Sequence, residues 1–342
     1  MSATPNHNPH LETDLWRWAL FESGMNRGRA REVLLQGAQS QSFSLFWQAG
    51  PGIMAQQLGL SMDETQALHQ AHAQWPQIEQ RLNAERRRGL LTLRLNDARY
   101  PDSLNRFVPL KRRPLLLFVR GETALLELPL ILPLGHDGNE TRAAWALETL
   151  ADLTSEGVLV LFVARPGLDA QGIQAFLKAG LPFALVIPQG LEAYTPPAGL
   201  QTALDAGRAL LISPFQPTWQ PQSRTTNPML PHAISFAQTL AHAWLALGAL
   251  ASPPAAGQVC LCAPELSGTP SCPQPYQDPE ALFLLLAEAT TPIHQNHTPT
   301  PQPAPERPPL SPEEILQTLT LGGKIPAALA ARLKTGKNHG LS

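Results

Sequence analysis

Cysteine is scarce in this sequence, and its placement excludes a disulfide scaffold. Cys260, Cys262 and Cys272 are odd in number and all lie late in the chain. They do not form the evenly paired set of a small secreted protein, and a reduced, cytoplasmic setting is the simpler interpretation. The Cys-x-Cys pair with its third cysteine lacks an evident fourth ligand, so we predict no metal site.

Long hydrophobic runs and a charge excess of one sign are also missing. The longest apolar run, residues 240–251, contains a histidine and is too short to cross a bilayer. The N-terminus lacks the basic start and apolar stretch of a signal peptide. The formal net charge is −2, so bulk electrostatics predict neither nucleic-acid nor membrane binding, and any such binding needs a local patch. We predict a cytoplasmic protein without membrane contacts.

Proline, by contrast, is abundant. The 342-residue chain has 35 prolines, which cluster toward the C-terminus, and its length suggests two domains plus tails. We expect a disordered N-terminus over residues 1–10, a proline-rich linker over 291–310 and a short helical tail over 311–342. The tail would serve as an interaction motif or be the remnant of a small domain.

A small all-α domain is predicted over residues 11–89. Apolar residues there recur three and four positions apart, and Ser61 with Glu64 has capping-box spacing ahead of the last helix. The stretches "ESGMNRGRAREVLLQ" and "QAGPGIMAQQLGL" have the spacing of a helix-hairpin-helix or SAM-like domain, whose loop amides can meet a DNA phosphate. A helical bundle without DNA contacts is the favoured alternative, because the glycine pattern is loose.

After residue 89 short apolar runs of strand length alternate with helical segments up to about residue 290. The clearest unit, residues 129–164, reads as strand, glycine loop, amphipathic helix and strand. Such alternation predicts an α/β domain with a Rossmann-like, mostly parallel sheet covered by helices on both faces.

Two loops follow predicted strands at the edge where such sheets bind ligands. They are residues 133–142, with Gly135 and His136, and residues 163–172, with Gly167 and Asp169. Neither is a G-x-G-x-x-G or P-loop motif, so no nucleotide cofactor is predicted. We interpret Asp169 as the cap of a helix that begins after it, in preference to a ligand-binding role.

The order of several degenerate motifs resembles the DprA family, also called Smf, of DNA-processing proteins. The stretch at 99–122 is similar to the family's tyrosine-proline segment, and Gly167, Leu168 and Asp169 keep its G-[IL]-D core. Gly190, Leu191 and Tyr194 match a later motif, and so do Ser213, Asn227 and Ser235, with Arg224 displaced. Asp137 replaces the arginine of the family's glycine-serine-arginine motif.

The resemblance implies a function as well as a fold. It implies a Rossmann-like domain related to the lysine-decarboxylase-like phosphoribohydrolases, acting as a dimer that protects single-stranded DNA and hands it to the RecA recombinase. The proline-glycine-glycine-x-glycine-threonine loop of those hydrolases is absent from the sequence. We therefore predict no catalytic residues and no enzyme activity.

Residues 81–120 carry an unusual excess of basic side chains. They contain 11 Lys and Arg against 3 Asp and Glu, a local charge of 11 − 3 = +8. Such an excess can hold a nucleic-acid backbone, and we prefer this interpretation to a solvated helix end with paired arginines. The predicted nucleic-acid-binding residues are Arg86, Arg87, Arg88, Lys111, Arg112, Arg113, Arg142, Arg165 and Arg224.

The leading hypothesis is therefore a divergent DprA-like protein that binds single-stranded DNA without chemistry. Two alternatives stay open. In one, the same domain holds a nucleotide or small phosphate as a sensor, at the pocket residues Gly135, His136, Gly167, Asp169 and Asn227. In the other, the pocket binds nothing and the proline-rich tail recruits a protein partner.

Overall fold

A computed structural model describes residues 10–40, 43–48, 50–135, 138–222, 227–250, 253–266 and 274–290. The chain divides into two compact units, Met1–Thr291 and Pro292–Ser342. The predicted linker at 291–310 and helical tail at 311–342 lie outside the described residues, and so does nearly all of the predicted disordered N-terminus. The described helices and strands all belong to the first unit.

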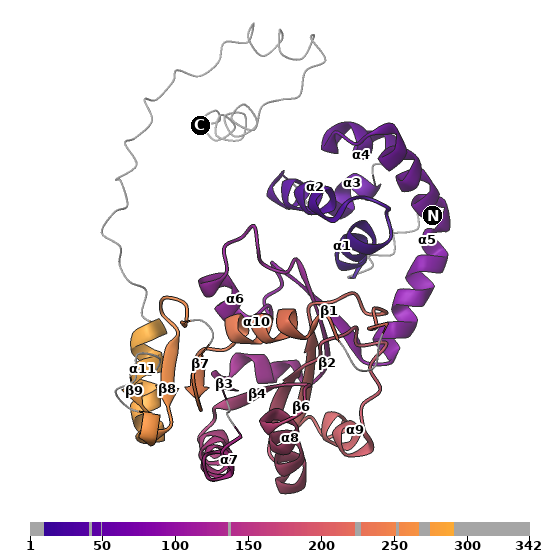
Figure 1. Cartoon of the computed structure of the whole chain (residues 1–342). Coiled ribbons are helices and arrows are strands. Elements are labelled where there is room, and N and C mark those ends of the chain that lie inside the picture. The colour runs from indigo at the N-terminus through magenta and orange to yellow at the C-terminus, as the bar shows by residue number, and fades with distance from the viewer. Residues whose placement is uncertain are drawn as a thin grey trace, which may run out of the picture. The chain divides into compact units, whose positions relative to one another are not determined.

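The first unit begins with a helical region (Figure 1). Its helices are α1 (Leu11–Phe21), α2 (Arg27–Ser40), α3 (Phe43–Gln48), α4 (Pro51–Leu58) and α5 (Met62–Arg87). Trp16, Trp18 and Trp47 are buried among them. The capping box predicted from sequence is present: the Glu64 N–H donates to Ser61 Oγ over 3.2 Å, and the Ser61 N–H donates to Glu64 Oε2 over 2.8 Å.

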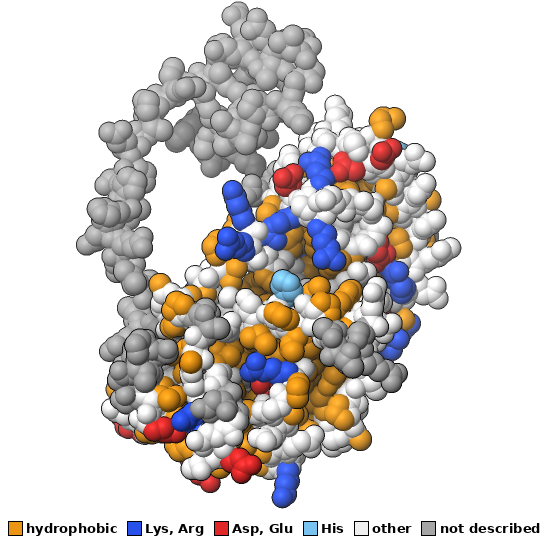
Figure 2. All heavy atoms as spheres, viewed as in Figure 1, with side chains coloured by type: hydrophobic (Ala, Val, Ile, Leu, Met, Phe, Trp, Pro, Cys, Tyr) orange, Lys and Arg blue, Asp and Glu red, His pale blue; other side chains and the backbone are white. Residues whose placement is uncertain are grey.

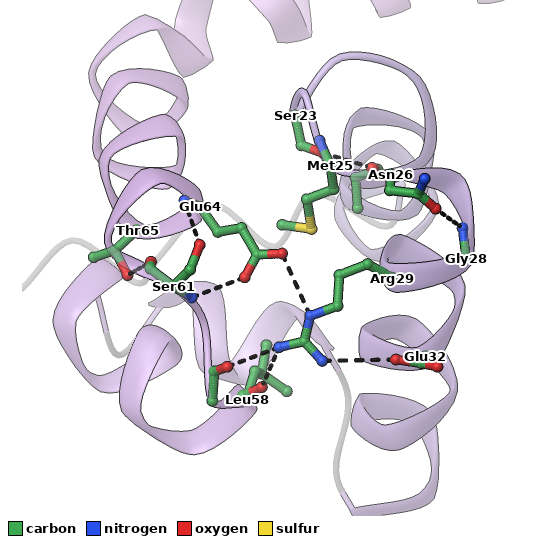
Figure 3. Close-up of polar contacts among 12 residues, drawn as sticks. Ser23, Met25, Asn26, Gly28, Arg29, Glu32, Leu58, Ser61, Glu64 and Thr65 are labelled. Carbon is green, nitrogen blue, oxygen red and sulfur yellow. Dashed lines mark hydrogen bonds and ion pairs between the residues drawn. The ribbon is translucent and has the colours of Figure 1, made fainter.

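A basic side chain links α2 to the corner between α4 and α5 (Figure 3). The Arg29 guanidinium donates to the Gly59 carbonyl over 2.7 Å and lies 3.3 Å from the Glu64 carboxylate. The carbonyls just before a helix-to-helix turn have no partner within their own helix. Arg29 satisfies them, so this guanidinium is committed to holding the helices together.

The described residues of the sheet region form nine strands, most of them parallel. The strand order is β1-β2-β6-β5-β4-β3-β7-β8-β9, and only the β1–β2 and β2–β6 pairs are antiparallel. The bounds are β1 (Leu90–Arg94), β2 (Leu116–Gly121), β3 (Leu130–Leu134), β4 (Leu159–Val163), β5 (Phe183–Val186), β6 (Ala209–Ser213), β7 (Ala243–Ala246), β8 (Val259–Cys262) and β9 (Gln274–Pro275).

Helices cover both faces of this sheet (Figure 1). One face packs against α7 (Glu140–Ser155), α8 (Leu168–Ala179), α9 (Ala198–Asp205) and α11 (Pro279–Thr290), and the other against α6 (Asp102–Phe107) and α10 (Leu230–Leu240). The central strands β3 to β6 are buried along their whole lengths, as expected when helices shield both sides. The predicted α/β, Rossmann-like class with a helical region in front is confirmed.

Two details differ from the sequence-based expectations. Strand β7 arises from "AWLA", within a stretch that we did not predict to be a strand, and it pairs with β3 and β8. The cysteines are not all thiols: Cys260 is free and buried, whereas Cys262 is disulfide-bonded. Cys272 lies outside the described residues.

Candidate nucleic-acid interface

The strand order reverses at β3, which makes this strand the switch point of the sheet. Chain connections leave β3 toward β4 on one side, and β7 pairs with it on the other. Open α/β sheets bind ligands in the crevice outside the carboxyl ends of the strands at such a point. A cleft of about 260 Å³ lies here, between the loop after β3 and the loop after β4, lined by residues 133–135 and 165–169.

Gly135 is required by the close approach of two loops at this cleft. Its φ of +74° lies in the left-handed region, and a Cβ there would lie 3.1 Å from the carbonyl oxygens of Gly248 and Ala249. Those carbonyls belong to the loop after β7. The loop that follows β7 thus borders the cleft, beside Gly135.

The second predicted loop places its arginine against its own carboxylate. Arg165 Nε donates to Asp169 Oδ2 over 2.6 Å, and the other carboxylate oxygen of Asp169 accepts the Val163 N–H over 2.8 Å. Asp169 is 2% exposed. Burial raises the pKa of Asp169, and the Arg165 charge opposes that rise.

The prediction that Asp169 caps a helix is wrong. Helix α8 begins at Leu168, before Asp169, and its N-cap is Gly167 with φ +91°. The carboxylate points back to the end of β4 because the Val163 N–H and the Arg165 guanidinium are both within hydrogen-bond reach there. Asp169 therefore closes the β4–α8 turn from inside, and the same contact occupies the arginine.

Arg142 is also held internally. It lies in the first turn of α7, where its Nε lies 2.7 Å from Glu265 and its Nη1 donates to the Leu247 carbonyl over 2.9 Å. Its side chain is 10% exposed. The guanidinium joins the start of α7 to the segments that follow β7 and β8, so its position in the fold is that of a tie between elements.

Of the remaining residues predicted at the pocket, some lie outside the described ranges and one is part of the fold. His136, Asp137 and Arg224 lie outside the described residues. Asn227 bridges two segments: its Nδ2 donates to the Pro188 carbonyl over 2.8 Å, and its Oδ1 accepts the Met229 N–H over 2.9 Å. Both functional groups of Asn227 are thus used to hold the start of α10 against the loop after β5.

The three consecutive arginines at the end of α5 do not act as one cluster. Arg86 lies 2.6 Å from the buried Asp14 and is 18% exposed. Arg88 lies 2.6 Å from Glu192. Arg87 and Arg88 are both exposed, and of the three arginines Arg87 makes no ion pair within the described part of the chain. Helical geometry points successive residues in different directions, which separates the three.

The wider basic run shows the same pattern of pairing. Seven of its eleven members have a carboxylate partner in the described residues. They are Arg81, Arg86, Arg88, Arg94, Arg99, Arg106 and Arg120. Most of the run therefore has the carboxylate partners of the alternative interpretation, because a sum of formal charges takes no account of partners from elsewhere in the chain. That the run binds nucleic acid stays a prediction.

The loop before β2 is the exception. Arg113 folds back on it, donating from Nε to the Val108 carbonyl over 2.6 Å and from Nη2 to the Asn105 carbonyl over 2.6 Å. Arg31 of α2 holds it from the other side, donating to the Leu110 carbonyl and, over 2.8 Å, to the Arg113 carbonyl. Two guanidiniums thus fix the backbone of residues 108–113.

Lys111 and Arg112 project from this fixed loop. Both are exposed, and neither makes an ion pair with any described residue. Arg27 lies one helical turn before Arg31 on the same face of α2, and it too is exposed without an ion pair in the described chain. Figure 2 shows basic side chains close together over α2 and this loop. We call Arg27, Lys111 and Arg112 the basic loop surface.

Helix α2 contributes to this surface, which we did not predict from the sequence. Arg27 and Arg31 are four residues apart, a spacing that places side chains on one helix face and that can be recognised in the sequence. The sequence does not show that Arg31 reaches carbonyls 79 and 82 residues away in the chain. Tyr100, the tyrosine within the basic run, is a core residue whose hydroxyl donates to the Pro114 carbonyl over 2.8 Å.

The doubly covered parallel sheet with its switch-point cleft defines a Rossmann-like α/β protein. Residues 91–230 match the family model of the DNA recombination-mediator protein A. The matched segment includes the loop before β2.

The same fold occurs in a solved structure. The structure of DNA processing protein A (DprA) from Streptococcus pneumoniae aligns with a TM-score of 0.53 and 17% identity, over 78% of this chain and 95% of that chain. DNA processing protein A from Helicobacter pylori, described for its single-stranded DNA binding mode, aligns with a TM-score of 0.43 and 16% identity, over 58% and 96%. A search of curated proteins found no match. Among the described helices, none has the length and apolar content that a bilayer crossing requires.

Proposed function

We propose that this protein binds single-stranded DNA and does not catalyse a reaction on it. The observation that carries the proposal is the pair of exposed cations, Lys111 and Arg112, on a fixed loop inside the matched DprA domain. Phosphate contacts supply most of the sequence-independent affinity for nucleic acid. Cations without carboxylate partners can make such contacts without first breaking an internal ion pair.

A finer role follows from the family resemblance. In this role the protein forms a homodimer in the cytoplasm, protects incoming single strands during natural transformation and hands them to the RecA recombinase. The absence of the phosphoribohydrolase loop from the sequence supports a role without hydrolysis. This scheme assigns no cofactor to the protein itself.

The direct test is a salt titration with a fluorescently labelled oligonucleotide. The full chain should bind at low salt, and the logarithm of affinity should fall linearly with the logarithm of salt concentration, by about 0.7 per phosphate contact. Fluorescence anisotropy measures both quantities. Absence of binding at low salt would reject the proposal.

The finer role has its own measurements. Sedimentation of the purified chain should give twice the mass of one chain. Addition of the protein should shorten the lag before RecA forms filaments on a single strand. A monomer, or an unchanged lag at concentrations where the oligonucleotide binds, would remove the RecA role and leave DNA binding intact.

A further inference from the structure

Among the described residues, the two arginines at the carboxyl edge of the sheet that were predicted to bind DNA already have partners in the protein. Arg165 is paired with Asp169, and Arg142 is paired with Glu265 and with the Leu247 carbonyl. A phosphate that drew the Arg165 guanidinium away from Asp169 would leave this carboxylate, 2% exposed, without its cation. Removing one partner of a buried ion pair is strongly unfavourable, since an uncompensated charge remains.

The cleft also presents a negative charge of its own. Asp169 lines it together with Arg165, so an entering phosphate would meet a carboxylate as well as a guanidinium. The net field of the pair is close to that of a neutral dipole. A site of this kind does not attract a polyanion over distance.

The basic loop surface has the opposite properties. Its three cations are exposed and make no ion pair with described residues. No Asp or Glu occurs in the sequence between Asp102 and Glu122, so the loop has no acidic neighbour along the chain. The hydrogen bonds from Arg31 and Arg113 hold the loop backbone in place. Little ordering of the backbone is then needed when a ligand binds.

We infer that the single-stranded DNA lies along the basic loop surface, across α2 and the loop before β2, and not in the switch-point cleft. This inference rests on the proposed function. Binding at this surface would rest on contacts with DNA phosphates. The aromatic rings closest along the chain do not offer a stacking platform, because Tyr100 is buried and Phe107 is half-buried. We therefore expect weak dependence of affinity on base sequence.

The first experiment maps the contact with a lysine-specific acetylating reagent. The described residues contain two lysines, Lys111 on the loop and Lys178 in the last turn of α8, both exposed. Mass spectrometry compares the labelling of each in the full chain, with and without a single-stranded oligonucleotide. Protection of Lys111 with unchanged labelling of Lys178 is expected, and equal labelling of Lys111 in both samples would overturn the inference.

The second experiment uses three variants and the salt titration. Lys111→Ala with Arg112→Ala should lower affinity at least tenfold and reduce the salt slope by about 1.4, at about 0.7 per contact. Lys178→Ala removes a charge from an exposed site elsewhere and should leave both unchanged. Arg165→Gln should also leave both unchanged, with its melting temperature recorded alongside.

The outcomes separate the two proposals. Wild-type binding that is lost in Arg165→Gln and kept in the double loop variant would overturn the inference and leave the proposed function standing. Absence of wild-type binding at low salt would reject the proposed function itself, and the inference with it. If Arg165→Gln does not fold, the lysine labelling of the wild-type chain decides the question alone.

Discussion

The switch-point cleft and the basic loop surface both carry arginines, yet they differ in what those arginines contact. In the cleft, Arg165 pairs with the Asp169 carboxylate. In the first turn of α7, Arg142 likewise faces a carboxylate and a carbonyl of the protein itself. At the basic loop surface, Arg31 of α2 and Arg113 of the loop bond to backbone carbonyls, and Lys111 and Arg112 make no ion pair with described residues. An arginine can therefore contribute to nucleic-acid binding indirectly, by fixing the backbone of the loop that carries the cations in contact with the nucleic acid.

The difference has a local cause in the sequence. Asp169 lies four residues after Arg165, close enough for an ion pair across the β4–α8 turn. The segment between Asp102 and Glu122 has no acidic residue. Cations there can find carboxylates only from distant parts of the chain, and Lys111 and Arg112 find none among the described residues.

The largest expected effect concerns the cleft. Asp169→Ala leaves the Arg165 guanidinium and the Val163 N–H without their acceptor, and we expect it to lower the free energy of unfolding by about 3 kcal/mol. The matched control is Asp102→Ala, which removes an exposed partner of Arg106 and should change stability by less than about 0.5 kcal/mol. Urea unfolding measures both. Similar losses in the two variants would show that the cleft pair is not a structural tie.

The next effect concerns the support of the loop. Arg31→Ala removes the hydrogen bonds to the Leu110 and Arg113 carbonyls and should lower stability by about 1.5 kcal/mol. It should also weaken oligonucleotide binding, because Lys111 and Arg112 lose their fixed backbone. Arg31→Lys keeps the charge but not the two-pronged geometry. If Arg31 acts as a positioning residue, the lysine variant should bind almost as weakly as the alanine variant; full recovery would assign its effect to charge alone.

A smaller effect is expected for Arg27. It lies one turn from Arg31 and would contribute one phosphate contact, so Arg27→Ala should reduce the salt slope by about 0.7. Thermal stability should not change, because the side chain is exposed and makes no ion pair with described residues. Arg87→Ala, an exposed cation at the end of α5, is the comparison. Equal slopes for wild type and Arg27→Ala would remove α2 from the interface.

The smallest effect is the pH dependence of the cleft pair. Burial raises the pKa of Asp169 despite the opposing Arg165 charge, so the folded protein keeps this proton to higher pH than the unfolded chain. The stability associated with protonation is present at low pH and is lost as pH rises through the raised pKa. The advantage of wild type over Asp169→Asn should therefore shrink in urea unfolding as pH rises from below the ordinary aspartate pKa through the raised pKa of Asp169. An advantage that grows with rising pH would reverse the assigned direction.

Much of the fold was readable in the sequence, because short apolar runs bounded by turn residues are hard to place other than in a buried parallel sheet. Strand β7 was the exception. Its four residues follow α10 after a gap of two, inside the mostly apolar run at 240–251. Periodicity does not separate a buried strand from a buried helix over so short a length. Backbone pairing with β3 and β8 on either side settles its conformation.

The amino-acid order was enough to establish the α/β class, the resemblance to the DprA family and the excess of basic residues over 81–120. Which of those cations are free depended on the folded chain. Arg86 meets Asp14 from 72 residues away, and Arg142 meets Glu265 from 123 residues away. The hydrophobic pattern that predicts helices and strands is local in the sequence. Ion pairs form between side chains that are close in space, so only the tertiary structure determines which cations remain unpaired and can bind a ligand.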